Sequence, residues 1–243
     1  MDVVLRFTLA AHCLACEEEL PRPTMGPVCE ECWERVPWYQ GPLCATCGAR
    51  LPTGVVCRCA DRPPHLSSLA CAADYAGPLP AIVQAFKYGG HQSLAAPLAH
   101  RLALHPQLHL DAADLIVAVP LHPWRRVVRG FNQADRIARA LGRTPISMLA
   151  RFHRTPPQAG LTAAVRRRNL RGTIRLMPRL TAAARERQRA TLRGARVLLV
   201  DDVVTTGATL SACAEVLREA GARDVRAATV ARTPPPGHQH DTP

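Results

Sequence analysis

Hydrophobic residues beyond about position 67 follow two patterns that alternate along the chain. Apolar residues recur at helical spacing in four segments: 79–88, 94–104, 131–141 and 211–221. Short, nearly continuous apolar runs, typical of strands buried on both faces, occupy three others: 115–119, 196–200 and 224–231. Because strands alternate with helices, we expect an α/β domain with a parallel sheet and right-handed crossovers over residues 67–233.

The two ends of the chain follow neither pattern. Residues 1–66 are rich in proline, hold eight of the ten cysteines and have few long apolar runs, so they cannot build a core of their own. Residues 234–243 (PPPGHQHDTP) are predicted to be a disordered tail whose two histidines do not bind metal. The sequence therefore predicts a small cysteine-rich module, a larger α/β domain and a tail.

The eight N-terminal cysteines form four close pairs: Cys13 and Cys16, Cys29 and Cys32, Cys44 and Cys47, Cys57 and Cys59. A two-residue spacer lets both sulfurs of a pair face one ion at about 2.3 Å, and two pairs complete a tetrahedral zinc site. We expect two zinc ions, one bound by the first two pairs and one by the last two, with an interleaved pairing as the alternative. Sites closed by four cysteines leave no open coordination position, so this zinc is structural.

Other interpretations of the cysteines compete with zinc. The apolar piece at residues 7–11 is a poor secretory signal, so we expect a cytoplasmic protein that starts where the sequence does. Cytosolic thiols stay reduced, which disfavours disulfides and leaves reduced structural thiols as the alternative. One spacer residue separates Cys57 from Cys59, so His65 or Cys71 could complete the second site instead.

Length and composition set further limits. A chain of 243 residues, 47% of them hydrophobic, is long enough for one or two domains with a real core. No apolar stretch approaches the ~20 residues that a membrane-spanning helix needs. Membrane insertion is therefore not expected.

The positive charge is concentrated in one segment. The chain holds 31 Lys and Arg against 19 Asp and Glu, a formal charge of +12. Residues 151–196 contain thirteen arginines and one acid, Glu186, and the rest of the chain is balanced at eighteen of each sign. A bias in genomic composition explains why arginine replaces lysine, but it does not explain the missing acids. The segment therefore indicates an anionic partner.

Candidate chemistry lies in residues 197–209 (VLLVDDVVTTGAT). A buried strand is expected to end on Asp201 and Asp202, at the carboxyl edge where α/β proteins bind ligands. The small residues that follow open a helix, and their amides and hydroxyls suit a phosphate monoester: Thr205, Thr206, Gly207, Ala208 and Thr209. A ribose 5-phosphate satisfies both parts, because its hydroxyls meet the acids and its phosphate meets the loop. The chain lacks a P-loop motif with its lysine, which disfavours ATP hydrolysis.

This stretch resembles the phosphoribosyl diphosphate (PRPP) motif of type I phosphoribosyltransferases, and nearly the whole chain is similar to the ComF family of competence proteins. Five features carry the resemblance: the cysteine pairs, FKYGG at 86–90, VPLHPWRRVVRGFNQA at 119–134, QAGLTAAVRRRNLRG at 158–172 and DDVVTTGAT at 201–209. It implies a type I phosphoribosyltransferase-like domain behind a double zinc ribbon. Residues 178–193 make a stretch longer than the family pattern needs, and we assign them no role.

The resemblance also implies roles for individual residues. Asp201 and Asp202 would be catalytic, holding the ribose hydroxyls, the second through Mg²⁺, and residues 205–209 would bind the 5-phosphate. Pyrophosphate would meet the loop after the 115–119 strand and nearby arginines: Pro120, Leu121, Arg125 and Arg129. Residues 154–172 stand where such enzymes have a lid. The acceptor is not readable from the sequence, with His122 and His153 as candidate bases, and binding of PRPP only as a signal is the alternative to transfer.

A second implied role concerns DNA. ComF resemblance points to natural transformation, in which the protein would handle single-stranded DNA with a helicase and recombination mediators. Arg166, Arg167, Arg168 and Arg171 are the expected contacts. Aromatic residues, which stack on bases, make up only 4% of the chain, so we expect contact with the backbone and little sequence preference. A zinc-ribbon interaction module alone would not explain residues 201–209.

Overall fold

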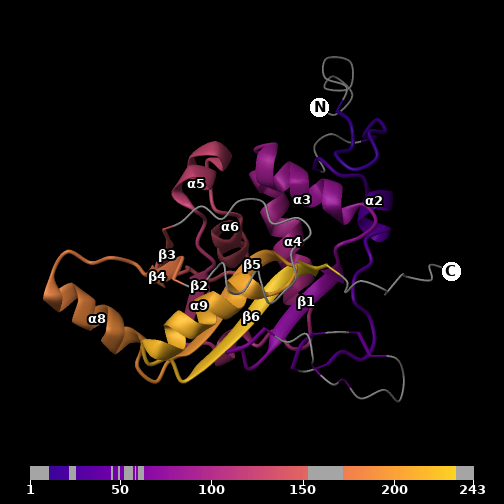
Figure 1. The fold of residues 1–243 in the computed structure, drawn as a ribbon. Coiled ribbons are helices and arrows are strands. Elements are labelled where there is room, and N and C mark those ends of the chain that lie inside the picture. Colours follow the sequence, from indigo (N-terminus) through magenta and orange to yellow (C-terminus); the bar gives the residue numbers. More distant parts are fainter. Residues whose placement is uncertain are drawn as a thin grey trace.

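The computed structural model describes residues 11–21, 26–44, 46–48, 50–51, 57, 59, 63–152 and 172–233. Its centre is a four-stranded sheet with the order β1-β6-β5-β2, and all three pairings are parallel (Figure 1). The strands are β1 (Leu69–Asp74), β2 (Leu115–Ala118), β5 (Arg196–Val204) and β6 (Asp224–Arg232). The parallel α/β fold predicted from the alternating pattern is thus confirmed.

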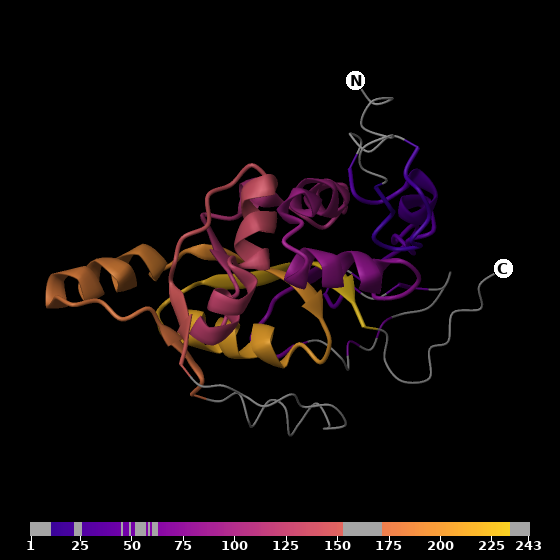
Figure 2. The ribbon, with the colours of Figure 1, turned by 90° about the horizontal axis from the view of Figure 1, so that it is seen from above.

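Helices cover both faces of this sheet. One face packs against α3 (Leu79–Tyr88), α4 (Ala95–Ala103) and α6 (Gln133–Ala140), and the other packs against α9 (Ala208–Glu219) (Figure 2). Side chains of β5 alternate between the two cores: Leu198 and Val200 face the first, Val197 and Leu199 the second. A strand buried on both faces has apolar residues at successive positions, which is why this run was visible in the sequence.

Several elements were not predicted. These are the short helix α2 (Glu30–Glu34), the 3-10 turns η2 (Gln92–Leu94) and η3 (Leu110–Ala112), the helices α5 (Pro123–Arg129) and α8 (Ala182–Leu192), strand β1, and an antiparallel pair of strands, β3 (Leu149–Arg151) and β4 (Ile174–Leu176). Helix α5 buries none of its residues and α8 buries only Gln188 and Leu192, so neither shows a strong apolar stripe.

Strand β5 extends further than the sequence predicted. The apolar run stops at residue 200, and the strand was expected to end on the two aspartates. The ladder continues instead, because Val203 and Val204 pair with Ala231 and Arg232 of β6. Asp201 and Asp202 therefore lie within the strand, near its carboxyl end.

The described residues between 11 and 59, which we call the cysteine-rich module, cover the outer edge of β1. The Tyr39 amide donates to the Ala72 carbonyl at 2.8 Å, and the Leu69 amide donates to the Thr46 carbonyl at 3.1 Å. Side chains add to this contact, since the Tyr39 hydroxyl donates to the buried Asp74 carboxylate at 2.6 Å. The module thus satisfies backbone groups that an edge strand would leave open.

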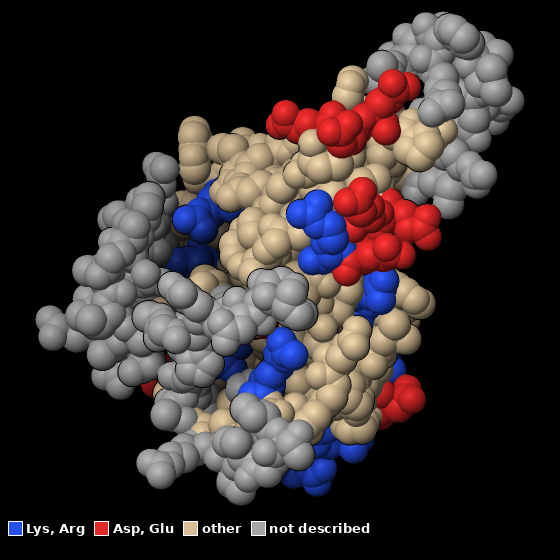
Figure 3. All heavy atoms as spheres, turned by 90° about the vertical axis from the view of Figure 1, so that its right-hand side faces the viewer, with Lys and Arg blue, Asp and Glu red and all other residues tan. Residues whose placement is uncertain are grey.

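The cysteine-rich module and α8 lie at opposite ends of the molecule (Figures 1 and 2). The module has six exposed glutamates: Glu17, Glu18, Glu19, Glu30, Glu31 and Glu34. Figure 3 shows acidic side chains gathered in one part of the surface. Among the described residues, no helix is long and apolar enough to cross a membrane.

Candidate functional site

The two aspartates of β5 stand next to a buried lysine. Asp202 Oδ2 lies 3.2 Å from Lys87 Nζ, and both side chains are largely buried, at 12% and 17% exposed. Backbone amides fix the carboxylates further, because the Asp202 amide donates to Asp201 Oδ1 at 2.9 Å and the Val203 amide donates to Asp202 Oδ1 at 2.6 Å. The carboxyl edge of the sheet therefore holds two acids in defined positions.

These acids do not ionise independently. Burial, and after it the negative charge of Asp202, raise the pKa of the Asp201 carboxyl to about 7, while the positive charges of Lys87 and Arg151 oppose that rise. The positive charges of the protein alone therefore do not fully compensate the negative charge of ionised Asp201. A cation or hydroxyl donors placed here would stabilise the ionised pair.

The loop after β5 has the geometry of an anion cradle. Gly207 adopts a left-handed conformation with φ of 69°, and helix α9 starts at Ala208. A side chain at Gly207 would also collide with Pro63, so glycine is required on two counts. Thr205 is exposed, and Thr206 and Thr209 are half-buried. Amides in the first turn of a helix lack intrahelical partners and attract phosphate oxygens.

The segment predicted to meet pyrophosphate lies between β2 and α6. It contains Pro120, Leu121 and helix α5, on which Arg125 is exposed. Arg129 is already engaged: its Nη1 donates to Gln133 Oε1 at 3.0 Å and its Nη2 donates to the Tyr88 hydroxyl at 2.8 Å, while the guanidinium stacks over the Tyr88 ring.

Two polar side chains in this segment cap helices. Asn132 caps α6 through its bond from the Ala134 amide and also donates to the Val119 carbonyl. His122 Nδ1 accepts from the Trp124 amide at the start of α5. Both side chains thus shape the loop.

Lys87, Tyr88 and Arg151 were not selected as site residues from the sequence. Lys87 and Tyr88 end α3, and Gln133 Nε2 donates to the Lys87 carbonyl at 3.5 Å, which links the FKYGG and RGFNQ segments to Asp202. The signal was present, since Lys87 is the only lysine of the chain and lies in a segment that carried the family resemblance. Arg151, on β3, interacts electrostatically with Asp201, and no local pattern indicated that contact.

Part of the predicted site lies outside the described residues. This concerns His153, the lid segment 154–172, and the expected DNA contacts Arg166, Arg167, Arg168 and Arg171.

The cysteines form the two groups that the simplest pairing predicts. Ligand atoms within each group lie within 4.8 Å of one another: Cys13, Cys16, Cys29 and Cys32 in the first, Cys44, Cys47, Cys57 and Cys59 in the second. Four sulfurs in this arrangement fit a tetrahedral zinc ion. Cys71 cannot replace a ligand, because it is fully buried in the core formed with α9 and its sulfur accepts from the Thr229 hydroxyl.

Comparison with known proteins agrees with both parts of this architecture. Residues 4–61 match the double zinc ribbon domain and residues 128–242 match the phosphoribosyl transferase domain. DNA utilization protein YhgH of Escherichia coli (strain K12) is 34% identical over 195 residues, 75% of this chain and 78% of that protein. Competence protein F of Haemophilus influenzae is 31% identical over 184 residues, 72% of this chain and 76% of that protein.

Among solved structures, a purine phosphoribosyltransferase from Pyrococcus horikoshii Ot3 matches 60% of this chain and 76% of that chain, with 20% identity and a TM-score of 0.34, a likeness too weak to add to the assignment. The fold and the cysteine groups thus define a protein that joins a double zinc ribbon to a phosphoribosyltransferase domain. At the identity and coverage of its relatives, the chain belongs to the ComF family of competence proteins.

Zinc content tests the two cysteine groups. We expect close to two equivalents of zinc in the purified protein by elemental analysis, and about one equivalent in Cys59→Ser, because each group closes around its own ion. Cys71→Ala is the matched control and should keep two. Loss of zinc from the control would contradict the grouping, as would a wild-type protein without zinc.

The pKa of Asp201 predicts how stability depends on pH. An unfolded aspartate titrates near 3.9, so the folded state binds this proton more tightly, and the free energy of unfolding should fall as the pH rises from about 4 to about 7. The loss should be on the order of 2–4 kcal/mol in urea unfolding of the ligand-free protein. Asp201→Asn should remove most of it, whereas Asp111→Asn, at an exposed position, should not. An unchanged slope in Asp201→Asn would assign the effect to another group.

Proposed function

We propose that this ComF-family protein binds PRPP with Mg²⁺ at the carboxyl edge of the sheet and acts in DNA uptake. One observation carries the ligand: two adjacent aspartates, one of them paired with Lys87, lie on the same edge as a glycine-dependent loop that opens a helix. A ligand with a phosphate monoester and a vicinal diol matches this pair of features. The assignment of roles to single residues is part of the proposal.

In this proposal, residues 205–209 bind the 5-phosphate, and the carboxylates of Asp201 and Asp202 face the ribose hydroxyls. Asp202 would hold Mg²⁺ in part, and that ion would supply positive charge to neutralise the pyrophosphate. Lys87 already places a positive charge 3.2 Å from that carboxylate, so the ligand-free site keeps Asp202 compensated. Pro120, Leu121, Arg125 and Arg129 would line the pyrophosphate side.

Transfer and sensing would use the same site and differ in whether pyrophosphate leaves. A phosphoribosyltransferase breaks the bond between ribose C1 and pyrophosphate while an acceptor nucleophile attacks C1. A sensor only binds PRPP. We favour transfer, because the buried acids and Lys87 resemble a reaction centre more than a simple recognition site. Release of pyrophosphate in the presence of one candidate acceptor, but not without it, would decide for transfer.

Ligand binding is testable by thermal unfolding. PRPP with Mg²⁺ at about a hundredfold its dissociation constant should stabilise the native state by about 2.7 kcal/mol, a rise in Tm on the order of 5–10 °C. The double variant Asp201→Asn with Asp202→Asn should lose this rise, and Asp111→Asn should keep it. A full rise in the double variant would place the ligand elsewhere.

The DNA role rests on the family and on charge. Relatives carry the names Competence protein F and DNA utilization protein. The glutamates on the cysteine-rich module would repel phosphates, so we place single-stranded DNA on the arginine-rich side of the α/β domain. A cytoplasmic location, with a helicase and recombination mediators as partners, completes the proposal.

The expected DNA contacts give a direct test. Replacing Arg166, Arg167 and Arg168 together by alanine should weaken binding of a single-stranded oligonucleotide about uniformly across sequences and reduce the salt slope, because each neutralised phosphate releases counterions. Fluorescence anisotropy at several salt concentrations measures both. If the triple variant instead loses the PRPP-induced rise in Tm and keeps its DNA affinity, these arginines serve a lid over pyrophosphate.

A further inference from the structure

A polar pocket lies at the amino edge of the sheet, at the end of β5 opposite Asp201 and Asp202. It has a volume of about 490 Å³ and is formed where β1, β5 and β6 begin and by the segment between α4 and β2. Its lining residues are Ser67, Ser68, Gln107, His109, Arg196, Arg223, Asp224 and Arg226. Neither the PRPP proposal nor the family motifs use these residues.

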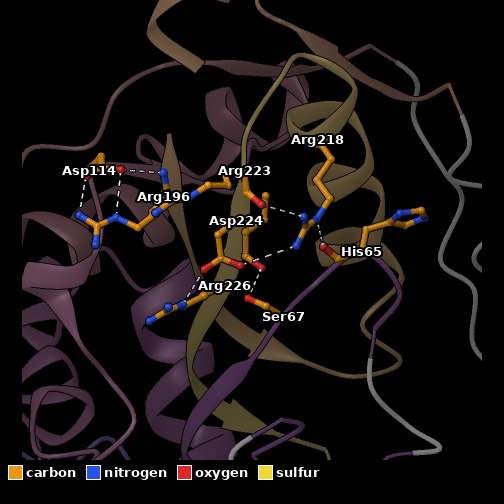
Figure 4. A network of polar contacts seen from close by, with 9 residues as sticks. His65, Ser67, Asp114, Arg196, Arg218, Arg223, Asp224 and Arg226 are labelled. Carbon is orange, nitrogen blue, oxygen red and sulfur yellow. Dashed lines mark hydrogen bonds and ion pairs between the residues drawn. The ribbon is translucent and has the colours of Figure 1, made fainter. Parts of the chain in front are cut away.

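Positive charge exceeds negative charge around this pocket. Three arginines pair with two aspartates here, and Arg223 adds a fourth cation, which gives an excess of two positive charges: Arg196, Arg218, Arg226 and Arg223 against Asp114 and Asp224 (Figure 4). Such an excess in a concave site attracts anions.

The two aspartates hold arginines in fixed positions. Arg196 donates through Nη2 and Nε to the two carboxylate oxygens of Asp114, at 2.7 and 3.1 Å. These bonds lower the pKa of Asp114 to about 2, so the pair stays ionised. Arg226 Nε donates to Asp224 Oδ2 at 2.8 Å. A guanidinium held by one edge still has N–H groups on its other edge, which can meet a phosphate.

Arg223 differs from its neighbours. Its side chain is exposed and forms no hydrogen bond or ion pair within the part of the chain that the structure describes. Its backbone is fixed, because the Arg223 amide donates to the Ala195 carbonyl and its carbonyl accepts from Arg218 Nη1 at 3.1 Å. Arg223 is thus a cation on a rigid support: its charge acts on Asp114 without a direct ion pair, so its N–H groups are open to a ligand.

Further exposed arginines lie on helix α8, which ends near the pocket. The Gly194 amide donates to the Gly221 carbonyl at 2.8 Å, so the end of α8 lies beside the turn that carries Arg223. Helix α8 projects from the body of the domain (Figures 1 and 2). Its exposed residues include Arg185, Arg187 and Arg189. Exposed cations at the pocket and on α8 suit a polymer of phosphates better than a single phosphate. This gives residues 178–193 a role.

We propose that the amino-edge pocket binds phosphates of a single-stranded nucleic-acid backbone, with Arg223 as a direct contact and Arg196 and Arg226 as positioned partners. The inference rests on the proposed DNA function and locates a contact surface outside residues 166–171. Because PRPP would bind at the opposite edge of the sheet, the two ligands occupy separate sites.

Arg223→Glu is the variant of choice, since the Arg223 side chain forms no hydrogen bond or ion pair with the described residues, whereas loss of Arg196 would leave Asp114 without its partner. Arg136→Glu is the matched control: it makes the same charge change at an exposed position of α6, a helix that does not line the pocket. Binding of labelled oligothymidylate of about 20 nucleotides is followed by fluorescence anisotropy at several salt concentrations. A mixed-sequence oligonucleotide and a mononucleotide serve as comparison ligands.

Arg223→Glu should weaken binding of both oligonucleotides at least about tenfold and lower the salt slope by about 1, while Arg136→Glu changes affinity less than about twofold. The PRPP-induced rise in Tm should be the same in Arg223→Glu as in the wild type. Equal affinities of the two variants would overturn the pocket as a DNA contact and leave the DNA function standing.

Two other outcomes would refute the DNA function or the identity of the ligand. A wild-type protein that binds no oligonucleotide refutes the proposed DNA function itself. A mononucleotide that binds as tightly as the oligonucleotide, and loses affinity in Arg223→Glu, refutes the backbone as the ligand.

Discussion

The direction of the strands determines where the charged groups of this protein lie. In a parallel sheet all carboxyl ends share one edge and all amino ends share the other. Because β5 pairs in parallel with both β2 and β6, its first residue, Arg196, and its paired acids, Asp201 and Asp202, are assigned to opposite edges. One edge thereby gathers carboxylates beside a helix start, and the other gathers arginines. Two polar surfaces of different composition thus lie at opposite edges of one sheet.

The parts of the fold that the sequence predicted are those whose signal is local. Strand β5 and helix α9 carry apolar residues at the period that their own burial requires, and the paired cysteines encode their geometry in a two-residue spacer. The grouping of Cys57 and Cys59 with Cys44 and Cys47 was the simplest arrangement and is the one found. Strand β1 was not predicted because its sequence, LACAAD, owes its burial to neighbours on both faces and to the cysteine-rich module at its edge.

Contacts between distant segments could not be predicted from the sequence. The pairing of Lys87 with Asp202 joins residues more than a hundred positions apart, and nothing within FKYGG specifies which acid the lysine meets. The ionised network at the amino edge also depends on contact between distant segments. Asp114 and Arg196 become partners only once β2 lies beside β5. At the Lys87–Asp202 pair, burial strengthens an electrostatic effect that would be weak in water, so the chemistry of that site depends on tertiary packing.

The covered edge of β1 affects how a shortened protein would behave. Removing the cysteine-rich module would expose backbone donors and acceptors along a strand that is otherwise fully buried, and such an edge is a template for pairing with another chain. It would also remove Pro63 from its contact with Gly207 if the cut fell beyond that proline. Self-association of an isolated α/β domain would therefore reflect an open sheet edge, and lost activity in such a fragment would not show that the zinc ribbons contact DNA.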